Sequence, residues 1–153
     1  QYHPSTRGLG ATLTAALLVS NTLTVGHVGD SRCYLLSSGK MEQVTEDHSL
    51  VERMVRRGEL TREEARYHPN RNIIYRSIGS RGEIEVDILT RSLKRGDTIV
   101  LCSDGLTGML TDEEIAQIVF KSEDPGYAAK ELVVAANARG GDDNVSVIVV
   151  RVD

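Results

Sequence analysis

Three aspartates of this 153-residue sequence each stand in a turn-like segment beside an apolar, strand-like one. They are Asp30 in Gly29-Asp30-Ser31-Arg32, Asp104 in Ser103-Asp104-Gly105, and Asp143 in Gly140-Gly141-Asp142-Asp143-Asn144. A turn alone explains each of them, because Asp and Gly favour turns through local hydrogen bonds and positive φ angles. If the segments are neighbours in one sheet, however, three carboxylates gather at strand ends and repel one another. The pattern therefore leaves two interpretations open: three separate turns, or one shared cation site.

The cation expected at such a site is Mg²⁺ or Mn²⁺, because these hard divalent ions take oxygen ligands and keep several waters. A zinc site is disfavoured, since no cysteine stands at ligand spacing from the aspartates. Cys33 and Cys102 each lie in apolar, strand-like sequence, where buried and unreactive thiols are expected. Two thiols are too few for a disulfide framework, and a reducing cytoplasm is the expected location.

Four further residues could take part in chemistry but have simpler explanations. His27 lies within a strand-like segment and is expected to be packed and hydrogen-bonded rather than a metal ligand. His48 and His68 bracket a polar segment and are expected in solvated cap or turn roles rather than in proton transfer. Arg32 could contact a carboxylate near the site or only brace the turn.

The elements that must position these residues begin with short strands rich in Thr, Val and Leu. Turn residues separate these segments and predict strands at 11–19, 22–28, 32–37 and 40–45. Because the connections are short, these strands should pair antiparallel in a meander. Further strands are expected at 72–78, 84–91, 97–103 and 145–152, and the run at 97–103 is apolar on both faces, as in a central strand.

Between these strands, helical periodicity and helix caps predict four helices. A polar insertion at about 46–71 contains a helix at 48–57 and a second one that begins at the capping box Thr61-Arg62-Glu63-Glu64 and ends before Pro69. Another capping box at Thr111 opens a helix to about 121, and a last helix is expected at 126–138. Strands first and helices later predict one α+β domain of packed layers.

Charge and hydropathy limit the classes of partner. The net charge of -4 and the pI of about 5.6 provide no general attraction for nucleic acid or acidic lipid surfaces. No apolar run approaches the roughly 18 residues of a membrane-spanning helix. An anionic substrate would therefore have to be bound by a local site.

Five segments resemble, in the same order, the second half of the bacterial type-2C (PPM) metal-dependent protein serine/threonine phosphatases. The segments are Gly8-Leu9-Gly10-Ala11-Thr12, Gly26-His27-Val28-Gly29-Asp30-Ser31-Arg32-Cys33-Tyr34, Thr45-Glu46-Asp47-His48-Ser49, Leu101-Cys102-Ser103-Asp104-Gly105-Leu106 and Gly140-Gly141-Asp142-Asp143-Asn144-Val145-Ser146. The resemblance covers nearly the whole chain and implies an αββα sandwich of two mainly antiparallel sheets flanked by helices. It also implies hydrolysis of phosphoserine and phosphothreonine by a metal-activated water, without a phosphoenzyme.

The resemblance further implies a role for each aspartate. Asp104 and Asp143 would be catalytic residues and ligands of a binuclear Mn²⁺ or Mg²⁺ centre, and Asp30 with Asp104 would serve a third, weaker metal position. The complete domain would thus hold two to three ions. Asp142 would be a solvated turn residue. The insertion at 46–71 would be the flap, which lies beside the active site and influences substrate choice.

The chain departs from the family by lacking the motifs of its first half, an Arg-x-x-Asn-Glu-Asp segment and an Asp-Gly-x-Gly-Gly motif. Residues 1–153 are therefore expected to be the C-terminal portion of a single catalytic domain and to be inactive alone. Expected partners are phosphoprotein substrates, a Ser/Thr kinase and the missing N-terminal half, and an uncovered sheet edge would favour self-association. The alternative is a catalytically inactive, phosphatase-like regulatory binding module.

Overall fold

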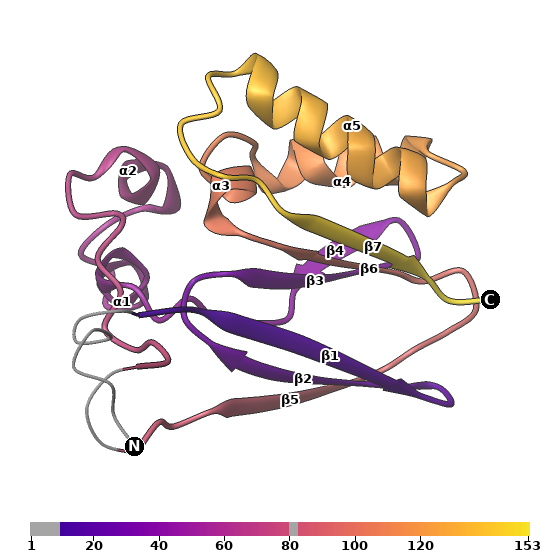
Figure 1. Ribbon diagram of the computed structural model, residues 1–153, viewed down its shortest axis with the longest axis horizontal. Helices are drawn as coiled ribbons and strands as arrows, with labels where there is room; N and C mark the ends of the chain where they lie inside the picture. The colour runs from indigo at the N-terminus through magenta and orange to yellow at the C-terminus, as the bar shows by residue number, and fades with distance from the viewer. Residues whose placement is uncertain (1–9, 80–82) are drawn as a thin grey trace.

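Two antiparallel sheets packed face to face form the centre of the computed structural model, which describes residues 10–79 and 83–153 (Figure 1). The first sheet has the order β1-β2-β5, with β1 (Leu13–Val19), β2 (Thr22–Val28) and β5 (Asp87–Ser92). The second has the order β4-β3-β6-β7, with β4 (Lys40–Gln43), β3 (Arg32–Ser37), β6 (Thr98–Cys102) and β7 (Val147–Arg151). The α+β layered fold expected from the sequence is confirmed.

Apolar side chains fill both the space between the sheets and the space under the helices, and β3 contributes to both. Cys33 and Leu35 belong to the cluster between the sheets, together with Leu23 and Val25 of β2. Their neighbours Tyr34 and Leu36 belong to the cluster under the helices. Successive side chains of a strand point to opposite faces, so a strand covered on both faces must be apolar throughout.

Two helices cover the outer face of the second sheet (Figure 1). Helix α4 (Asp112–Lys121) begins at a capping box in which Thr111 and Glu114 exchange side-chain and backbone hydrogen bonds. Helix α5 (Pro125–Ala138) begins at Asp124, whose side chain accepts a hydrogen bond from the backbone N–H of Tyr127. It buries Ala128, Leu132 and Ala136. Both helices were predicted from the sequence.

The flap contributes two short helices at one end of the sandwich (Figure 1). Helix α1 (Leu50–Arg56) begins after Ser49, whose hydroxyl accepts the N–H of Glu52. Helix α2 (Arg62–Tyr67) begins at Thr61 with a complete capping box to Glu64 and ends before His68-Pro69, as the sequence predicted. Local signals thus determine both helix starts.

Other sequence predictions were wrong. The strand expected at 72–78 is absent from this described segment, which makes only isolated bridges at Ile74 and Ile78. The strand expected at 84–91 is displaced to Asp87–Ser92. The first four strands form two separate hairpins rather than one meander, because the chain crosses from one sheet to the other between β2 and β3. The short helix α3 (Asp104–Thr107) was not foreseen.

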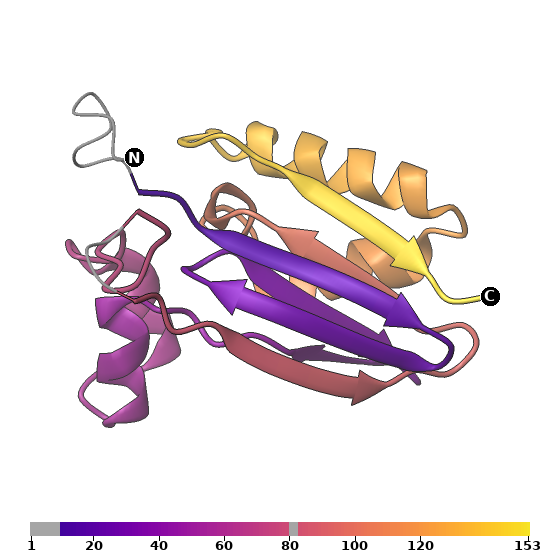
Figure 2. The ribbon, with the colours of Figure 1, turned by 60° about the horizontal axis from the view of Figure 1, so that its bottom comes forward.

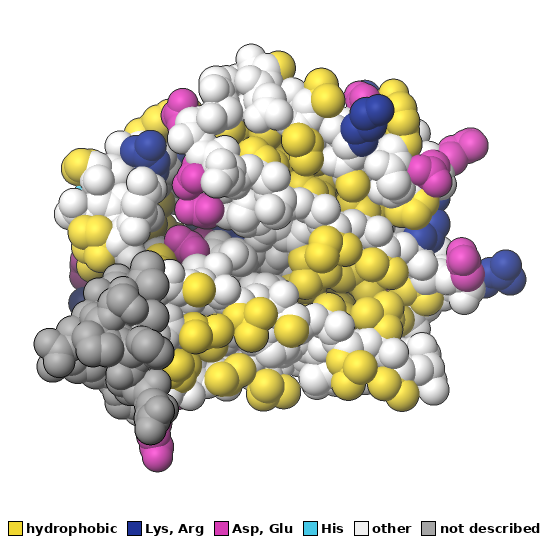
Figure 3. All heavy atoms as spheres, viewed as in Figure 1, with side chains coloured by type: hydrophobic (Ala, Val, Ile, Leu, Met, Phe, Trp, Pro, Cys, Tyr) yellow, Lys and Arg dark blue, Asp and Glu magenta, His cyan; other side chains and the backbone are white. Residues whose placement is uncertain are grey.

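The outer face of the first sheet carries no helix among the described residues (Figure 2). Side chains on this face are therefore exposed, among them Leu17 at 61% and Ile88 at 66%. Hydrophobic side chains also gather between β1 and β7, which are the edge strands of their sheets (Figure 3). In the described part of the chain, none of the helices has the length and apolar character needed to cross a membrane.

Candidate active site

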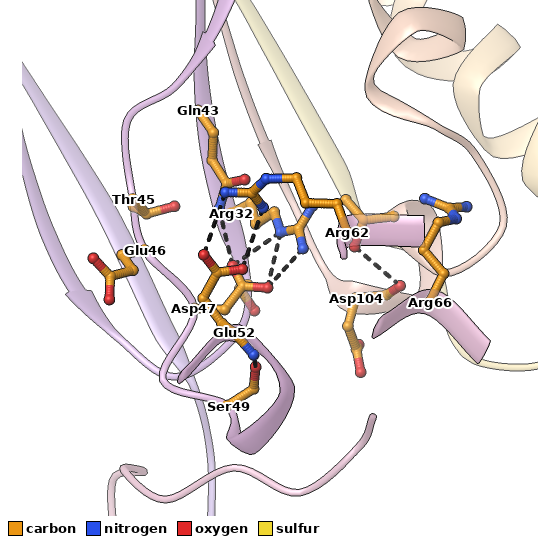
Figure 4. A network of polar contacts seen from close by, with 12 residues as sticks. Arg32, Gln43, Thr45, Glu46, Asp47, Ser49, Glu52, Arg62, Arg66 and Asp104 are labelled. Carbon is orange, nitrogen blue, oxygen red and sulfur yellow. Dashed lines mark hydrogen bonds and ion pairs between the residues drawn. The ribbon is translucent and has the colours of Figure 1, made fainter. Parts of the chain in front are cut away.

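A cleft of about 570 Å³ separates the flap from the end of the sandwich. Its walls include Asp30 from the β2–β3 turn, Asp104 from α3 and residues of both flap helices. Arg66 of α2 reaches across and donates hydrogen bonds to the carbonyl oxygens of Leu110 and Gly108, at 3.3 Å and 3.5 Å. Figure 4 shows Arg66 and Asp104 close together on this side of the network. The fold thus brings two of the three predicted aspartates to one cleft.

Asp30 is positioned by an unusual turn between the two sheets. Gly29 has φ +115°, and a Cβ atom at this position would lie 2.3 Å from Cγ2 of Thr12. Only glycine fits such a conformation and such a close approach. On the other side of Asp30, the Ser31 hydroxyl shares a hydrogen bond with the Thr12 hydroxyl, and the Ser31 carbonyl oxygen accepts one from the Thr14 hydroxyl.

Asp104 and Asp143 are brought together by hydrogen bonds between the end of β6 and the segment that precedes β7. The Ser103 hydroxyl donates to the carbonyl oxygen of Asn144 and accepts the N–H of Ser146, both at 3.0 Å. A Cβ atom on Gly105 would lie 2.4 Å from the Asn144 carbonyl oxygen. The glycine therefore permits the close contact that places Asp143 beside Asp104.

The charges of neighbouring aspartates act on the pKa values of Asp30 and Asp104. Burial, and then the negative charge of Asp104, raise the pKa of Asp30 to about 6. Burial, and then the charge of Asp143, raise the pKa of Asp104. Raised carboxyl pKa values of this origin favour either protonation or a bound cation. Asp104 is therefore the central member of the group.

The described residues fit a divalent cation site only in part. Clustered carboxylate oxygens are the donors that Mg²⁺ and Mn²⁺ prefer, and Asp30, Asp104 and Asp143 supply them. Yet no group of three or more His, Cys, Asp or Glu side chains, within residues 10–79 and 83–153, is arranged so that it could hold a metal ion by itself. These residues would contribute ligands rather than form a closed ligand set.

Comparison with known proteins relates this geometry to a family. The family model described as protein phosphatase 2C matches residues 3–62. The serine/threonine phosphatase stp of Listeria innocua is 41% identical over 144 residues, which are 94% of this chain and 57% of the relative. A solved S. agalactiae serine/threonine phosphatase superposes with a TM-score of 0.92 at 39% identity, covering 99% of this chain and 62% of that one. The chain is thus similar in sequence and fold to part of the protein phosphatase 2C proteins.

A second solved member of the protein phosphatase 2C family is described as the catalytic domain of PstP in complex with 2 manganese ions. It superposes with a TM-score of 0.87 at 38% identity. The matched region is 95% of this chain and 60% of the PstP chain. The chain spans about three fifths of the length of the relatives it matches and corresponds to their C-terminal part.

An ion pair between two residues that line the cleft was only partly foreseen from the sequence. Arg32 donates from Nε to both carboxylate oxygens of Asp47, at 2.9 Å and 3.0 Å, and from Nη2 to Oδ2 at 2.7 Å (Figure 4). Gln43 donates to the same carboxylate. Of the two roles considered for Arg32, contact with a carboxylate is therefore confirmed. Asp47 received no role from the sequence, although it lies in the matched segment Thr45-Glu46-Asp47-His48-Ser49.

The histidines also differ from one another. His27 is fully buried and hydrogen-bonded to Thr14 and to the carbonyl oxygen of Glu46, as predicted. His68 accepts the N–H of Asn70 through Nδ1, which confirms a turn role. The solvated role expected for His48 is wrong, because its side chain is 3% exposed and hydrogen-bonded at both ring nitrogens.

The two cysteines, Cys33 and Cys102, are buried as expected, and burial raises the pKa of both thiols to about 12.

Substitution of Gly105 by alanine should force Asp104 and Asp143 apart. The new Cβ atom would collide with the Asn144 carbonyl, so we expect the free energy of unfolding to fall by about 2–3 kcal/mol. Gly26→Ala is the matched control, because its Cβ atom would meet Ile88 at an ordinary 3.7 Å; we expect a change within about 0.5 kcal/mol. Urea denaturation of both variants measures the difference, and equal stabilities would contradict the tight contact.

The raised pKa of Asp30 predicts a pH-dependent stability in metal-free buffer. A carboxyl group with a folded-state pKa of about 6 and an ordinary value of 3.8 favours folding below the ordinary value, and this stabilisation is lost as the pH rises through about 6. Asp30→Asn should remove that dependence and stabilise the chain at pH 7 by about 1 kcal/mol, the part that solvent does not screen. Urea midpoints at pH 4 and pH 7 measure it, and parallel losses in the wild type and the variant would refute it.

Proposed function

We propose that this chain is part of a protein serine/threonine phosphatase domain that hydrolyses phosphoserine and phosphothreonine with Mn²⁺ or Mg²⁺. The observation that carries the proposal is the convergence of Asp30, Asp104 and Asp143: besides burial, the charge of Asp104 raises the pKa of Asp30, and the charge of Asp143 raises the pKa of Asp104. Support comes from the relatives, which are named serine/threonine phosphatases, and from the structure with 2 manganese ions. Residues 1–153 would form the C-terminal portion of one catalytic domain, with 46–71 as its flap.

Each aspartate has a proposed task in the complete domain, which would hold two to three ions. Asp104 and Asp143 would be ligands of the binuclear centre, and Asp30 with Asp104 would serve a third position. When bound, the ions activate a water and neutralise the phosphoryl oxygens. The chain's own residues orient this centre: Ser103 and Gly105 hold Asp143 beside Asp104, and the turn at Gly29 directs Asp30 toward both.

The cleft wall formed by the flap is the proposed contact surface for the phosphoprotein. Arg62 pairs with Glu52 at 3.2 Å, and Arg66 bonds the carbonyls of the α3–α4 connection. The first contact joins the two flap helices, and the second joins the flap to the sandwich. Substrate side chains would therefore meet an ordered surface beside Asp104. The flap supplies none of the proposed metal ligands, and we therefore assign it to substrate selection.

The exposed apolar surface is the proposed contact for the rest of the domain. It comprises the outer face of β1-β2-β5 and the edge strands β1 and β7, with Leu17, Ile88 and Ile148 each at least 60% exposed. Strand edges and apolar faces left uncovered favour association. We propose that the N-terminal half that the relatives possess packs here, and that self-association replaces this contact when the half is missing. A partner kinase and a cytoplasmic setting belong to the same proposal.

The experiment that tests the function is hydrolysis of a phosphothreonine peptide in Mn²⁺ by the chain joined to the N-terminal part of the Listeria innocua relative. Turnover that EDTA abolishes is the expected result. Tight metal binding without turnover would instead support the alternative, an inactive phosphatase-like module that binds a regulator.

A further inference from the structure

The Asp30 turn is held on both sides by side chains rather than by a strand ladder. On its C-terminal side, the Thr14 hydroxyl lies 3.1 Å from the carbonyl oxygen of Ser31, and Thr12 bonds the Ser31 hydroxyl at 2.8 Å. On its N-terminal side, Gly29 is buried and both of its backbone groups meet His48. Because Asp30 lies between two anchored residues, the direction of its carboxylate depends on these anchors.

His48 binds Gly29 with its ring and with its backbone. Its Nδ1 atom lies 3.0 Å from the Gly29 nitrogen, and its own N–H donates to the Gly29 carbonyl oxygen at 2.7 Å. A backbone N–H can only donate, so Nδ1 must be the unprotonated acceptor. The proton of the neutral ring is then on Nε2. A buried N–H group without this acceptor would have no compensating bond in the turn.

The protonated Nε2 atom connects the turn to the segment that follows the flap. It donates to Oδ2 of Asp87, at the start of β5, at 3.1 Å. Nη1 of Arg76 lies at the same distance from Nε2, but both atoms carry hydrogens in this tautomer, so the Asp87 carboxylate is the acceptor for both groups. Arg76 donates to Oδ1 of the same carboxylate at 2.7 Å and to Glu85 at 2.8 Å. Although burial acts to raise it, the pKa of Asp87 is lowered by the hydrogen bond from His48 and by the hydrogen bond and charge of Arg76. The Asp87 carboxylate is therefore ionised, and it holds the His48 ring in place by accepting the hydrogen bond from Nε2.

Neighbouring contacts hold the histidine ring in this orientation. The rings of His27 and Tyr75 lie 4.9 Å and 5.8 Å from it, centroid to centroid. The Tyr75 N–H donates to the His48 carbonyl oxygen at 2.9 Å, and Arg53 of α1 lies over the Tyr75 ring. The start of the flap and the segment that follows it thus meet at His48, beside the Asp30 turn.

We propose that His48, near the start of the flap, is a positioning residue that holds Asp30 for metal binding and is itself held by Asp87 and Arg76 of the segment that follows the flap. The inference rests on the proposed function, since it presumes that Asp30 binds a divalent ion. Residues that orient a metal ligand through hydrogen bonds affect metal affinity by about 10–100-fold when they are removed. His48 does so through the backbone of the adjacent Gly29 rather than through the carboxylate itself.

Variants at both ends of the network test this in the 153-residue chain. His48→Ala removes both ring bonds, whereas His48→Asn keeps an acceptor at the place of Nδ1 and loses the bond to Asp87. Asp87→Ala keeps the ring and removes its distant partner. His68→Ala is the matched control, because the His68 Nδ1 atom also accepts a backbone N–H, from Asn70, but far from Asp30 along the chain.

Three NMR measurements are informative. The ¹⁵N shifts of the His48 ring should show an unprotonated Nδ1 atom at pH 7, and the Gly29 amide should exchange faster in His48→Ala than in His48→Asn. In a Mg²⁺ titration followed at the Asp30 amide, His48→Ala should weaken binding by about tenfold or more. His48→Asn should restore most of this loss, and His68→Ala should match the wild type.

Several outcomes would overturn the proposal. A protonated Nδ1 atom, Gly29 exchange that is insensitive to His48→Ala, or equal Mg²⁺ affinities in His48→Ala and the wild type would each do so. If His48→Ala does not fold, Asp87→Ala decides: a Mg²⁺ affinity equal to that of the wild type would overturn the role of the His48–Asp87 contact in positioning Asp30. Absence of Mg²⁺ shifts at Asp30 with shifts retained at Asp104 would remove this inference and leave the proposed function intact. Absence of shifts at Asp104 and Asp143 would instead count against the function.

Discussion

The 153 residues alone should hydrolyse a phosphothreonine peptide at least about a thousandfold more slowly than the same chain joined to the N-terminal part of a related phosphatase. Both proteins are assayed in Mn²⁺ at equal concentration. The N-terminal part of the Listeria innocua stp protein is a suitable donor, because that relative is 41% identical to the chain over 144 residues. The joined protein should lose its activity in EDTA.

The large expected difference follows from the incomplete ligand set. Asp104 is close enough to Asp30 to raise its pKa, and Asp143 is close enough to Asp104 to do the same, but no metal-holding group of three acidic, histidine or cysteine side chains exists within the described chain. Two dications near each other repel unless fixed anions lie between them. Misplacement of the reacting groups by even 1 Å lowers the rate by orders of magnitude.

Controls separate the explanations of this result. The joined protein carrying Asp143→Ala should be as slow as the short chain. Robust, EDTA-sensitive turnover by the short chain would show that the motifs it lacks are dispensable. If the joined protein binds Mn²⁺ but does not turn over, the inactive binding module becomes the better interpretation.

Asp104→Asn should abolish measurable Mn²⁺ binding and reduce turnover of the joined protein by at least about a hundredfold. The substitution keeps the shape of the side chain and removes its charge, and amide oxygen is a weaker ligand for a hard cation than carboxylate. Asp104 has the central place, since its charge acts on Asp30 and the charge of Asp143 acts on it.

Asp142→Asn is the matched control for that experiment. Asp142 is exposed and stands directly before Asp143, so the same change in net charge occurs one residue away from the proposed ligand. We expect its Mn²⁺ affinity and turnover to stay within about twofold of the wild type, as for surface substitutions in general. Titration calorimetry on all three proteins gives the affinities. Equal binding by Asp104→Asn and the wild type would disprove the assignment of Asp104.

Helix starts and the central strand could be predicted from the sequence because their causes are local. The capping boxes at Thr61 and Thr111 are formed by residues three positions apart, and both occur in the structure. The run at 97–103 was predicted to be central because it is apolar on both faces, and β6 lies between β3 and β7. Local hydrogen bonds and side-chain alternation need no knowledge of distant residues.

The candidate site could be predicted only as a set of residue types at turns. The sequence left open whether the three aspartates occupy separate turns or share a site, because nothing local relates the β2–β3 turn to α3. The structure shows that Ser103, Gly105 and the turn at Gly29 bring these segments together. Why Gly29 must be glycine is likewise visible only from its contact with Thr12.

The helix caps and the turn-like segments around Asp30, Asp104 and Asp143 could thus be predicted from the sequence itself, whereas sheet membership and the role of His48 were decided by tertiary structure. Strands β2 and β3 have a short connection, yet they belong to different sheets: β2 pairs with β1 and β5, whereas β3 pairs with β4 and β6 and packs against β2 on one face and under the helices on the other. His48 looked like a solvated cap residue. It is buried because Gly29, Asp87 and Tyr75, all distant in the sequence, surround its ring and backbone with hydrogen-bond partners and contacts.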